Sequence, residues 1–206
     1  MKVGIVNYGM GNLGSVRRAL EDLGVQVFVA EHPAALFEAN RAVLPGVGAF
    51  GEGMAHLRDG GWVEVVRRIV HEGKPLLGIC LGMQMLASAG DEGGTTSGLG
   101  LVPGRVRRLD AIGCTLRVPH VGWNEVRCQA SDPLFGHIPS GSDFYFVHSF
   151  AFEPESQEFV SATTDYGVLV TAAVRQGNVF GTQFHPEKSS KAGRQLLRNF
   201  LDYVPC

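Results

Sequence analysis

The stretch Lys74-Pro75-Leu76-Leu77-Gly78-Ile79-Cys80-Leu81-Gly82-Met83-Gln84-Met85-Leu86-Ala87 contains the pattern on which the predicted fold depends. Its apolar run at 75–79 predicts a short buried strand, and residues 81–87 predict the start of a helix. Between them, Gly-x-Cys-x-Gly places Cys80 at a sharp turn, as in a nucleophile elbow. A helix N-terminus also favours the reactive thiolate. A buried core cysteine would fit the same residues, so the stretch alone leaves both interpretations open.

The composition is that of an ordinary globular chain. Its 206 residues are 45% apolar and 18% charged, with a net charge of -2. This length can bury a proper core, and we expect one domain over residues 1–206. The charge argues against a nucleic-acid or anionic-membrane partner. The sequence shows no membrane span or secretory leader, and the cysteines show no metal-type spacing. We therefore expect a cytoplasmic protein without a metal or other cofactor.

The first half of the chain alternates between strand and helix patterns. Strands are predicted at 3–7, 25–30, 41–44 and 75–79, and helices at 15–23 and along the apolar stripe from Trp62 to Val70. Such alternation predicts right-handed βαβ units. The expected fold class is therefore α/β, with a doubly wound open mixed sheet, a mostly parallel core and helices on both faces.

The second half consists mainly of short strand-like runs. They lie at 105–109, 115–118, 144–152, 158–163, 168–174 and 179–184. Their spacing predicts antiparallel additions to the main sheet or a small second sheet. A last helix carries Leu196, Leu197, Phe200 and Leu201, and the glycine-rich segment 90–100 is expected to be a surface loop.

A candidate base for Cys80 lies in Gln183-Phe184-His185-Pro186-Glu187. In an extended segment, residues i and i+2 project to the same face, so His185 and Glu187 can point together. A carboxylate beside an imidazole fixes its tautomer and supports the imidazolium, which leaves the other ring nitrogen for a nucleophile. By itself this segment is typical of a surface turn. Two such signals at strand ends of an α/β sheet favour a Cys80-His185-Glu187 triad.

These motifs also carry a resemblance. Segments 78–84 and 183–187 resemble the class I, triad-type glutamine amidotransferases. Four more segments, at 7–13, 44–50, 119–124 and 145–150, narrow the resemblance to the glutaminase subunits of imidazole glycerol phosphate synthases. The six motifs occur in the same order and span essentially the whole chain.

The resemblance implies hydrolysis of glutamine to glutamate and ammonia through a glutamyl thioester on Cys80. His185 would protonate the departing ammonia, and Glu187 would orient His185. The Leu81 amide is one oxyanion donor by position, and the resemblance assigns the second to the Val47 amide. Taken alone, the Pro-Gly-Val-Gly segment at 45–48 is typical of a tight turn.

Further residues are implied in substrate binding. Gln84 lies one helical turn beyond Cys80 on the same face and would hold the amino-acid end of glutamine. Backbone groups of Ser149 and Phe150 would share this task, as would Gly46 and Gly48. His148 is expected to be a packed strand histidine.

Ammonia needs an acceptor site, and the sequence contains no phosphate-binding loop or basic cluster for one. The resemblance implies a heterodimer with a (β/α)₈-barrel cyclase that makes imidazole glycerol phosphate and an aminoimidazole carboxamide ribonucleotide in histidine biosynthesis. Asn12, Trp123, Tyr145 and Lys188 match positions expected at that interface, although both aromatic residues would also suit a core.

Two alternatives stay open from the sequence. Gly9, Gly11 and Gly14 form a G-x-G-x-x-G after the first strand, and with Glu31 they fit a dinucleotide-binding fingerprint. This interpretation leaves Cys80 and its partners unused. The second alternative keeps the chemistry but changes the client, as in a γ-glutamyl cysteine hydrolase or the glutaminase of another synthase.

Overall fold

The nine-stranded sheet at the centre of the molecule is parallel on one side and antiparallel on the other. The computed structural model describes residues 1–129 and 131–205. Strand order is β2-β1-β3-β4-β13-β12-β11-β8-β9, and the first five run parallel. The parallel strands are β1 (Lys2–Val6), β2 (Gln26–Ala30), β3 (Arg41–Gly46), β4 (Leu76–Cys80) and β13 (Val179–Thr182). The predicted α/β fold class is confirmed.

The antiparallel half extends this sheet from β13. It contains β8 (His120–Cys128), β9 (Ser142–His148), β11 (Val160–Asp165) and β12 (Leu169–Gln176). A second, four-stranded sheet has the order β10-β7-β5-β6. Its strands are β5 (Ala89–Gly90), β6 (Thr96–Ser97), β7 (Gly104–Arg108) and β10 (Phe150–Pro154). Both predicted outcomes, added strands and a second sheet, therefore occur together.

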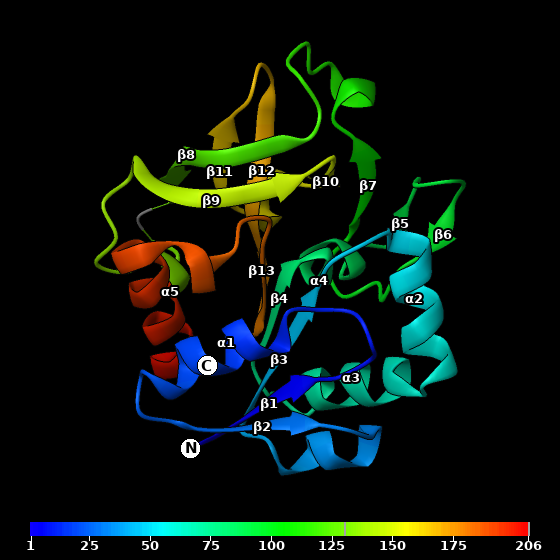
Figure 1. Cartoon of the computed structure of the whole chain (residues 1–206), viewed down its shortest axis with the longest axis vertical. Helices are drawn as coiled ribbons and strands as arrows, with labels where there is room; N and C mark the ends of the chain where they lie inside the picture. The colour runs from blue at the N-terminus through cyan, green and yellow to red at the C-terminus, as the bar shows by residue number, and fades with distance from the viewer. Residues whose placement is uncertain (130, 206) are drawn as a thin grey trace.

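Helices cover both faces of the parallel strands (Figure 1). On one side lie α1 (Leu13–Glu21) and α5 (Ser190–Asp202), and on the other α2 (Phe50–Asp59) and α3 (Trp62–His71). Neighbouring strand residues divide between two apolar cores, with Leu77 packing toward α1 and α5 and Leu76 toward α2 and α3. This division follows from the two-residue period of a strand. None of the helices in the described residues is both long and apolar enough to cross a membrane.

Five features differ from the sequence expectation, the last of them the strand predicted at 144–152. α2 was not predicted, because Gly51 and Gly53 weaken its helical pattern. Residues 115–118 form no strand: Leu116 is half exposed, and β8 begins only after Pro119, which has no N–H to donate. β8 itself was missed, and the predicted loop at 90–100 includes Gly90 of β5 and the whole of β6.

The predicted strand at 144–152 is two strands in two sheets. β9 ends at His148 in the nine-stranded sheet, and β10 begins at Phe150 in the four-stranded sheet. Ser149 lies at the break between them. The polar pair His148-Ser149 lies at the break, but strand-like residues continue on both sides of it, so the pattern does not reveal the change of sheet.

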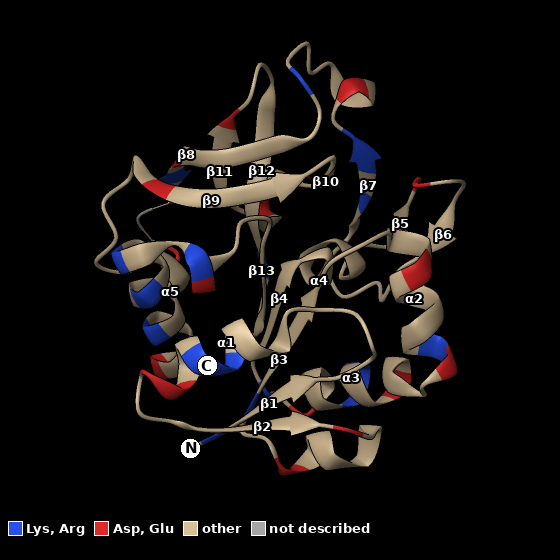
Figure 2. Cartoon of the chain, viewed as in Figure 1, with Lys and Arg blue, Asp and Glu red and all other residues tan. Residues whose placement is uncertain are grey.

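Charged residues lie around the rim of the fold and along β7 (Figure 2). β4, β13 and the short helix α4 (Leu81–Met85) contain no Lys, Arg, Asp or Glu. These three elements surround Cys80, so any charged group near the thiol must come from other segments.

The close approach of α4 to β3 depends on Gly82, where an added Cβ would overlap the carbonyl oxygen of Leu44. Gly82→Ala should therefore destabilise the protein, by about 3 kcal/mol, because two backbone segments would have to separate. The matched control is Gly14→Ala in α1, where the Cβ meets nothing within 4 Å. That change should be neutral or stabilise by up to about 1 kcal/mol. Urea unfolding measures both, and equal effects would contradict the packing argument.

Candidate active site

The residues predicted to be catalytic meet at the carboxyl ends of the central strands. Cys80 is the last residue of β4, and the sheet register places Gly46 of β3 opposite it. His185 follows β13, and its backbone N–H donates to the Tyr145 carbonyl of β9 at 2.9 Å. Open α/β sheets build their sites at this edge. The tertiary structure thus brings together residues that are more than 100 positions apart.

Cys80 has an unusual backbone conformation, with φ 55° and ψ -110°. A non-glycine residue in such a conformation costs on the order of 1–3 kcal/mol, which the surrounding structure must offset. Close backbone packing does so: a Cβ at Gly78 would lie 2.7 Å from the Gly82 carbonyl oxygen, and one at Gly46 would lie 2.9 Å from the Leu81 Cβ. The glycines around the thiol are therefore required by space. This geometry is that of a nucleophile elbow.

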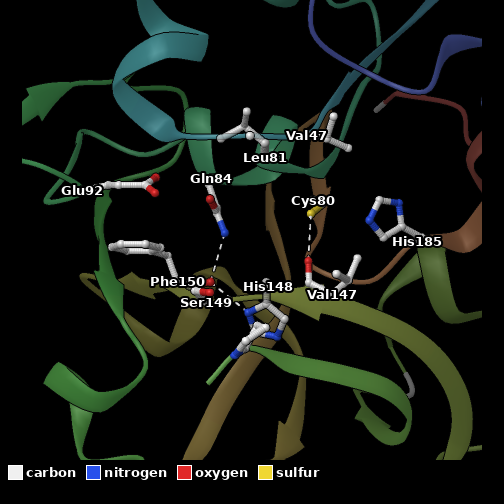
Figure 3. Close-up of a pocket in the computed structure, with 12 residues that line it drawn as sticks. Val47, Cys80, Leu81, Gln84, Glu92, Val147, His148, Ser149, Phe150 and His185 are labelled. Carbon is white, nitrogen blue, oxygen red and sulfur yellow. Dashed lines mark hydrogen bonds between the residues drawn. The ribbon is translucent and has the colours of Figure 1, made fainter. Parts of the chain in front are cut away.

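His185 and Glu187 form a buried pair. The Nδ1 atom of His185 lies 2.8 Å from the Glu187 Oε1, and the two side chains are 4% and 1% exposed. Nδ1 therefore carries a proton and donates a hydrogen bond to the carboxylate. This leaves Nε2 available for a reacting group. Nε2 is buried and has no hydrogen-bond partner among the described residues. The imidazole and the Cys80 thiol line the same cleft (Figure 3).

The pKa of His185 is raised to about 9. Burial lowers this pKa, but the interactions of the ring with Cys80 and with the Glu187 carboxylate raise it by more. His185 is consequently protonated at neutral pH. An imidazolium beside a cysteine can stabilise the thiolate and can later give its proton to a leaving group.

The thiol has two further polar contacts. The Cys80 Sγ lies 3.9 Å from the Val147 carbonyl oxygen and 3.8 Å from the Gln183 Nε2. Gln183 is fully buried, and its Oε1 accepts from the Gln84 Nε2 at 3.0 Å. Gln183 received no role from the sequence. Gln183 directly follows β13, and the parallel pairing of β13 with β4 brings it beside Cys80.

Cys80 lies in a cleft of about 330 Å³, at the lower end of the range for small-molecule sites. Its lining includes every predicted oxyanion and substrate residue except Gly46, namely Val47, Gly48, Leu81, Gln84, Ser149 and Phe150. In Figure 3, Glu92 and His185 lie on opposite sides of Cys80. The cleft therefore has a reactive end and an acidic end.

Glu92 was missed by the sequence analysis. Its carboxylate lines the cleft, where Oε2 accepts the backbone N–H of Phe50, the first residue of α2, at 2.7 Å. The residue lies between β5 and β6, in the segment expected to be a surface loop. An acidic residue in a glycine-rich segment has no local pattern that distinguishes it, so only the fold of the small sheet reveals its position.

Gln84 and Phe150 contact each other directly. The Gln84 Nε2 donates to the Phe150 carbonyl oxygen and to the Gln183 Oε1, each at 3.0 Å. Both amide hydrogens of Gln84 are then used, and its Oε1 is the polar atom left for a ligand. The Ser149 carbonyl accepts from the Leu109 N–H at 2.9 Å. Since a trans peptide is planar, the Phe150 N–H points away from that bond.

The oxyanion segment lies at the mouth of the cleft. Val47 is 45% exposed, and Gly48 has a φ of 110°, which favours glycine. The hydroxyl of Tyr8, from the turn after β1, lies against Gly46 and is buried without a partner among the described residues. Burial and then the charge of Cys80 raise the pKa of Tyr8, so the phenol stays neutral.

Three of the four expected interface residues lie together. Trp123 is 53% exposed, its ring lies 6.0 Å from that of Tyr145, and the Lys188 Nζ lies 5.7 Å from the Tyr145 ring centre. Trp123 is therefore not a core residue, and Tyr145 is half-buried. Asn12 comes from a different segment, where its side chain accepts the Ser15 N–H and caps α1.

The acidic residue expected to act with the glycine loop at 9–14 is already hydrogen-bonded within the chain. The carboxylate of Glu31, the residue expected to bind a ribose in the dinucleotide alternative, accepts from the Asn7 Nδ2 at 2.7 Å. Gly9 and Gly11 have φ values of 90° and 154°, so the turn does need glycine.

Cys114 and Cys128 are free thiols away from the cleft, and Cys206 lies outside the described residues.

Solved structures of amidotransferases share this fold. A glutamine amidotransferase crystal structure superposes with a TM-score of 0.76 at 24% identity, covering 97% of each chain. A chain of PurLQS from Thermotoga maritima superposes with a TM-score of 0.78 at 21% identity, covering 98% of each chain.

Sequence relatives narrow the assignment. The imidazole glycerol phosphate synthase subunit HisH of Moorella thermoacetica is 48% identical over 98% of this chain and 95% of its own. The subunit HisH of Symbiobacterium thermophilum is 49% identical over 97% of this chain and 92% of its own. Residues 4–204 match the class-I glutamine amidotransferase family. Together with the Cys80 elbow and its histidine–carboxylate pair, these matches show that the chain belongs to the class-I glutamine amidotransferases, among the HisH-type subunits of imidazole glycerol phosphate synthase.

Proposed function

We propose that this chain hydrolyses glutamine with Cys80, His185 and Glu187 as its catalytic triad and delivers the ammonia to a cyclase partner in histidine biosynthesis. The observation that carries the proposal is the buried His185–Glu187 pair, joined at 2.8 Å beside the strained Cys80 turn. Family membership favours this function over the dinucleotide-binding alternative, and the HisH relatives favour it over a γ-glutamyl hydrolase.

The chemistry follows from the charges at the reactive end. The Cys80 thiolate attacks the side-chain carbonyl carbon of glutamine, and its electron pair forms the C–S bond. The His185 Nε2–H protonates the amide nitrogen as the C–N bond breaks and ammonia departs. Water then attacks the thioester carbonyl, His185 accepts its proton, and glutamate and the thiolate are released. Glu187 holds the imidazole by Nδ1 throughout.

The two ends of the cleft suit the two ends of glutamine. The α-ammonium group needs acceptors, which the Glu92 carboxylate and the Gln84 Oε1 supply. The α-carboxylate needs donors, which the N–H groups of Ser149 and Phe150 supply. Because the Ser149 carbonyl bonds to Leu109, the Phe150 N–H of the same peptide points away from Leu109. Glutamine bound this way extends its side-chain amide toward Cys80.

The oxyanion of the tetrahedral intermediate needs two fixed N–H donors beside Cys80. The Leu81 amide follows the nucleophile directly, and the Val47 amide belongs to the exposed glycine-flanked segment at the mouth of the cleft. Gly46 and Gly48 allow that peptide to reorient. Loss of one such donor typically costs about 10²–10³ in turnover, so the orientation of this peptide can control activity.

An apolar face on the β8–β9 hairpin supports the cyclase partner. Val121 pairs with Val147, and Trp123 pairs with Tyr145, so the four side chains share one face. Val121 and Trp123 are more than half exposed, and the Val147 carbonyl contacts the Cys80 thiol. A partner covering this face would lie directly beside the cleft, as direct transfer of ammonia requires.

The nucleophile is tested with Cys80→Ala. Glutamine turnover should fall by at least about 10⁴-fold, because the thioester can no longer form. In the complex, synthase activity with added ammonium should persist. Cys128→Ala, which removes a free thiol outside the cleft, is the control and should behave like wild type. Glutamine turnover retained by Cys80→Ala would refute the triad.

The role of Glu187 is tested by the pH dependence of kcat/KM. Because the pKa of His185 is about 9, kcat/KM should fall as pH rises through 9 and His185 loses its proton. Glu187→Gln removes a charge that raises this pKa, so the alkaline limb should move to lower pH by about one unit. Turnover should fall by about 10²–10⁴-fold. Glu64→Gln, on the outer face of α3, is the control. An unmoved alkaline limb would contradict the assignment.

The requirement for a partner is tested by reconstituting the complex with the cyclase. The isolated chain should show little glutaminase activity, and the liganded cyclase should raise it by about 10²–10³-fold as the second oxyanion donor comes into place. Trp123→Ala should weaken cyclase binding by about 2 kcal/mol or more. Leu169→Ala, which removes another exposed apolar side chain, should leave it unchanged. High activity of the isolated chain would argue against this control by the partner.

A further inference from the structure

A chain of hydrogen bonds through neutral side chains ends at the backbone carbonyl of Phe150, a residue that lines the cleft. The Nδ1 atom of His148 lies 2.8 Å from the Phe150 carbonyl oxygen, and its Nε2 lies 2.9 Å from the Nδ1 of His120. The Nε2 of His120 lies 3.3 Å from the Nδ2 of Asn124. Both histidines are buried, and neither belongs to the triad.

The direction of this chain is determined by its ends. The Phe150 carbonyl can only accept, so the His148 Nδ1 carries a proton and its Nε2 accepts. His120 must then donate through Nδ1 and accept at Nε2. Asn124 donates to it, because the Asn124 Oδ1 is already occupied by the Glu125 N–H at 2.9 Å. The order of donation is therefore Asn124 to His120 to His148 to Phe150.

Both rings must be neutral for this order to hold. Burial lowers the pKa of His120 to about 4 and that of His148 to about 3. His120 is further held between two aromatic rings, with ring centres 3.9 Å from Tyr166 and 4.6 Å from Phe146. These rings cover the two faces of His120, while its hydrogen bonds to His148 and Asn124 set the direction of its N–H.

The acceptor at the end of the chain lies at the break between β9 and β10. The Phe150 carbonyl receives His148 on one side and Gln84 on the other, while the Ser149 carbonyl is held by Leu109. Both peptide planes that flank Phe150 are therefore fixed. The Phe150 N–H, which belongs to the first of these planes, is fixed with them.

We propose that His120 and His148 are positioning residues that hold the Phe150 carbonyl, and through it the backbone at the β9–β10 break that carries the N–H donors for the α-carboxylate of glutamine. The inference rests on the proposed function, since it assumes that glutamine binds in this cleft. Neither histidine reaches the reacting carbonyl, so loss of the chain should weaken glutamine binding without slowing the chemical steps.

The test compares three variants in complex with the cyclase partner. His120→Leu removes the donor to His148 and should raise KM for glutamine about five- to tenfold, with kcat within about twofold of wild type. His120→Asn returns an amide N–H near the position of Nδ1 and should recover most of the affinity. Tyr166→Leu removes stacking but keeps the hydrogen bonds, and its KM should match wild type.

The outcomes separate the inference from the function on which it rests. An unchanged KM in His120→Leu, or an equal rise in Tyr166→Leu, would overturn the positioning role. Absence of glutamine turnover in the wild-type complex would instead reject the proposed function.

A measurement on wild-type protein tests the chain without turnover. Histidine ¹⁵N spectra at neutral pH should show both rings neutral and protonated at Nδ1. A proton on Nε2 of either ring, or a charged ring, would overturn the inference even if glutamine is hydrolysed. This measurement also decides the matter if His120→Leu does not fold.

Discussion

The strained backbone at Cys80 is the constraint on which the rest of this structure depends. A cysteine with φ 55° persists only where neighbouring segments hold it, and here backbone packs directly against backbone. Gly78 and Gly82 allow β4 and α4 to meet without side chains between them, and Gly82 also lies against β3. This packing holds the thiol at the end of β4, in the same cleft as His185 and Val47.

The second organising feature is the break after His148. One predicted strand divides between two sheets, and Ser149 and Phe150 line the cleft at the break. A peptide in a regular strand would use those groups for the sheet ladder. Side chains take over where the ladder stops: Gln84 and His148 hold the Phe150 carbonyl, and the neutral pair of histidines needs no counter-charge in the interior.

Sequence patterns predicted much of the parallel half, because each βαβ unit has a local signature of period and turn. They also predicted the triad, since His185 and Glu187 are two residues apart and must share a face of an extended segment. Other features have no local signature. α2 is masked by two glycines, β8 lacks clear alternation, and nothing in the sequence marks Glu92 as a cleft residue or joins His120 to His148.

The sequence by itself predicted the nucleophile, its base and the carboxylate that orients the base, since short-range geometry and a resemblance across the chain both point to them. Only the tertiary structure decided which residues meet in the cleft beside Cys80. Glu92, Gln84 and Phe150 come from three separate segments, and their meeting depends on how the small sheet packs against α4 and the main sheet. Local spacing constrains residues a few positions apart, whereas long-range contacts depend on the packing of whole elements.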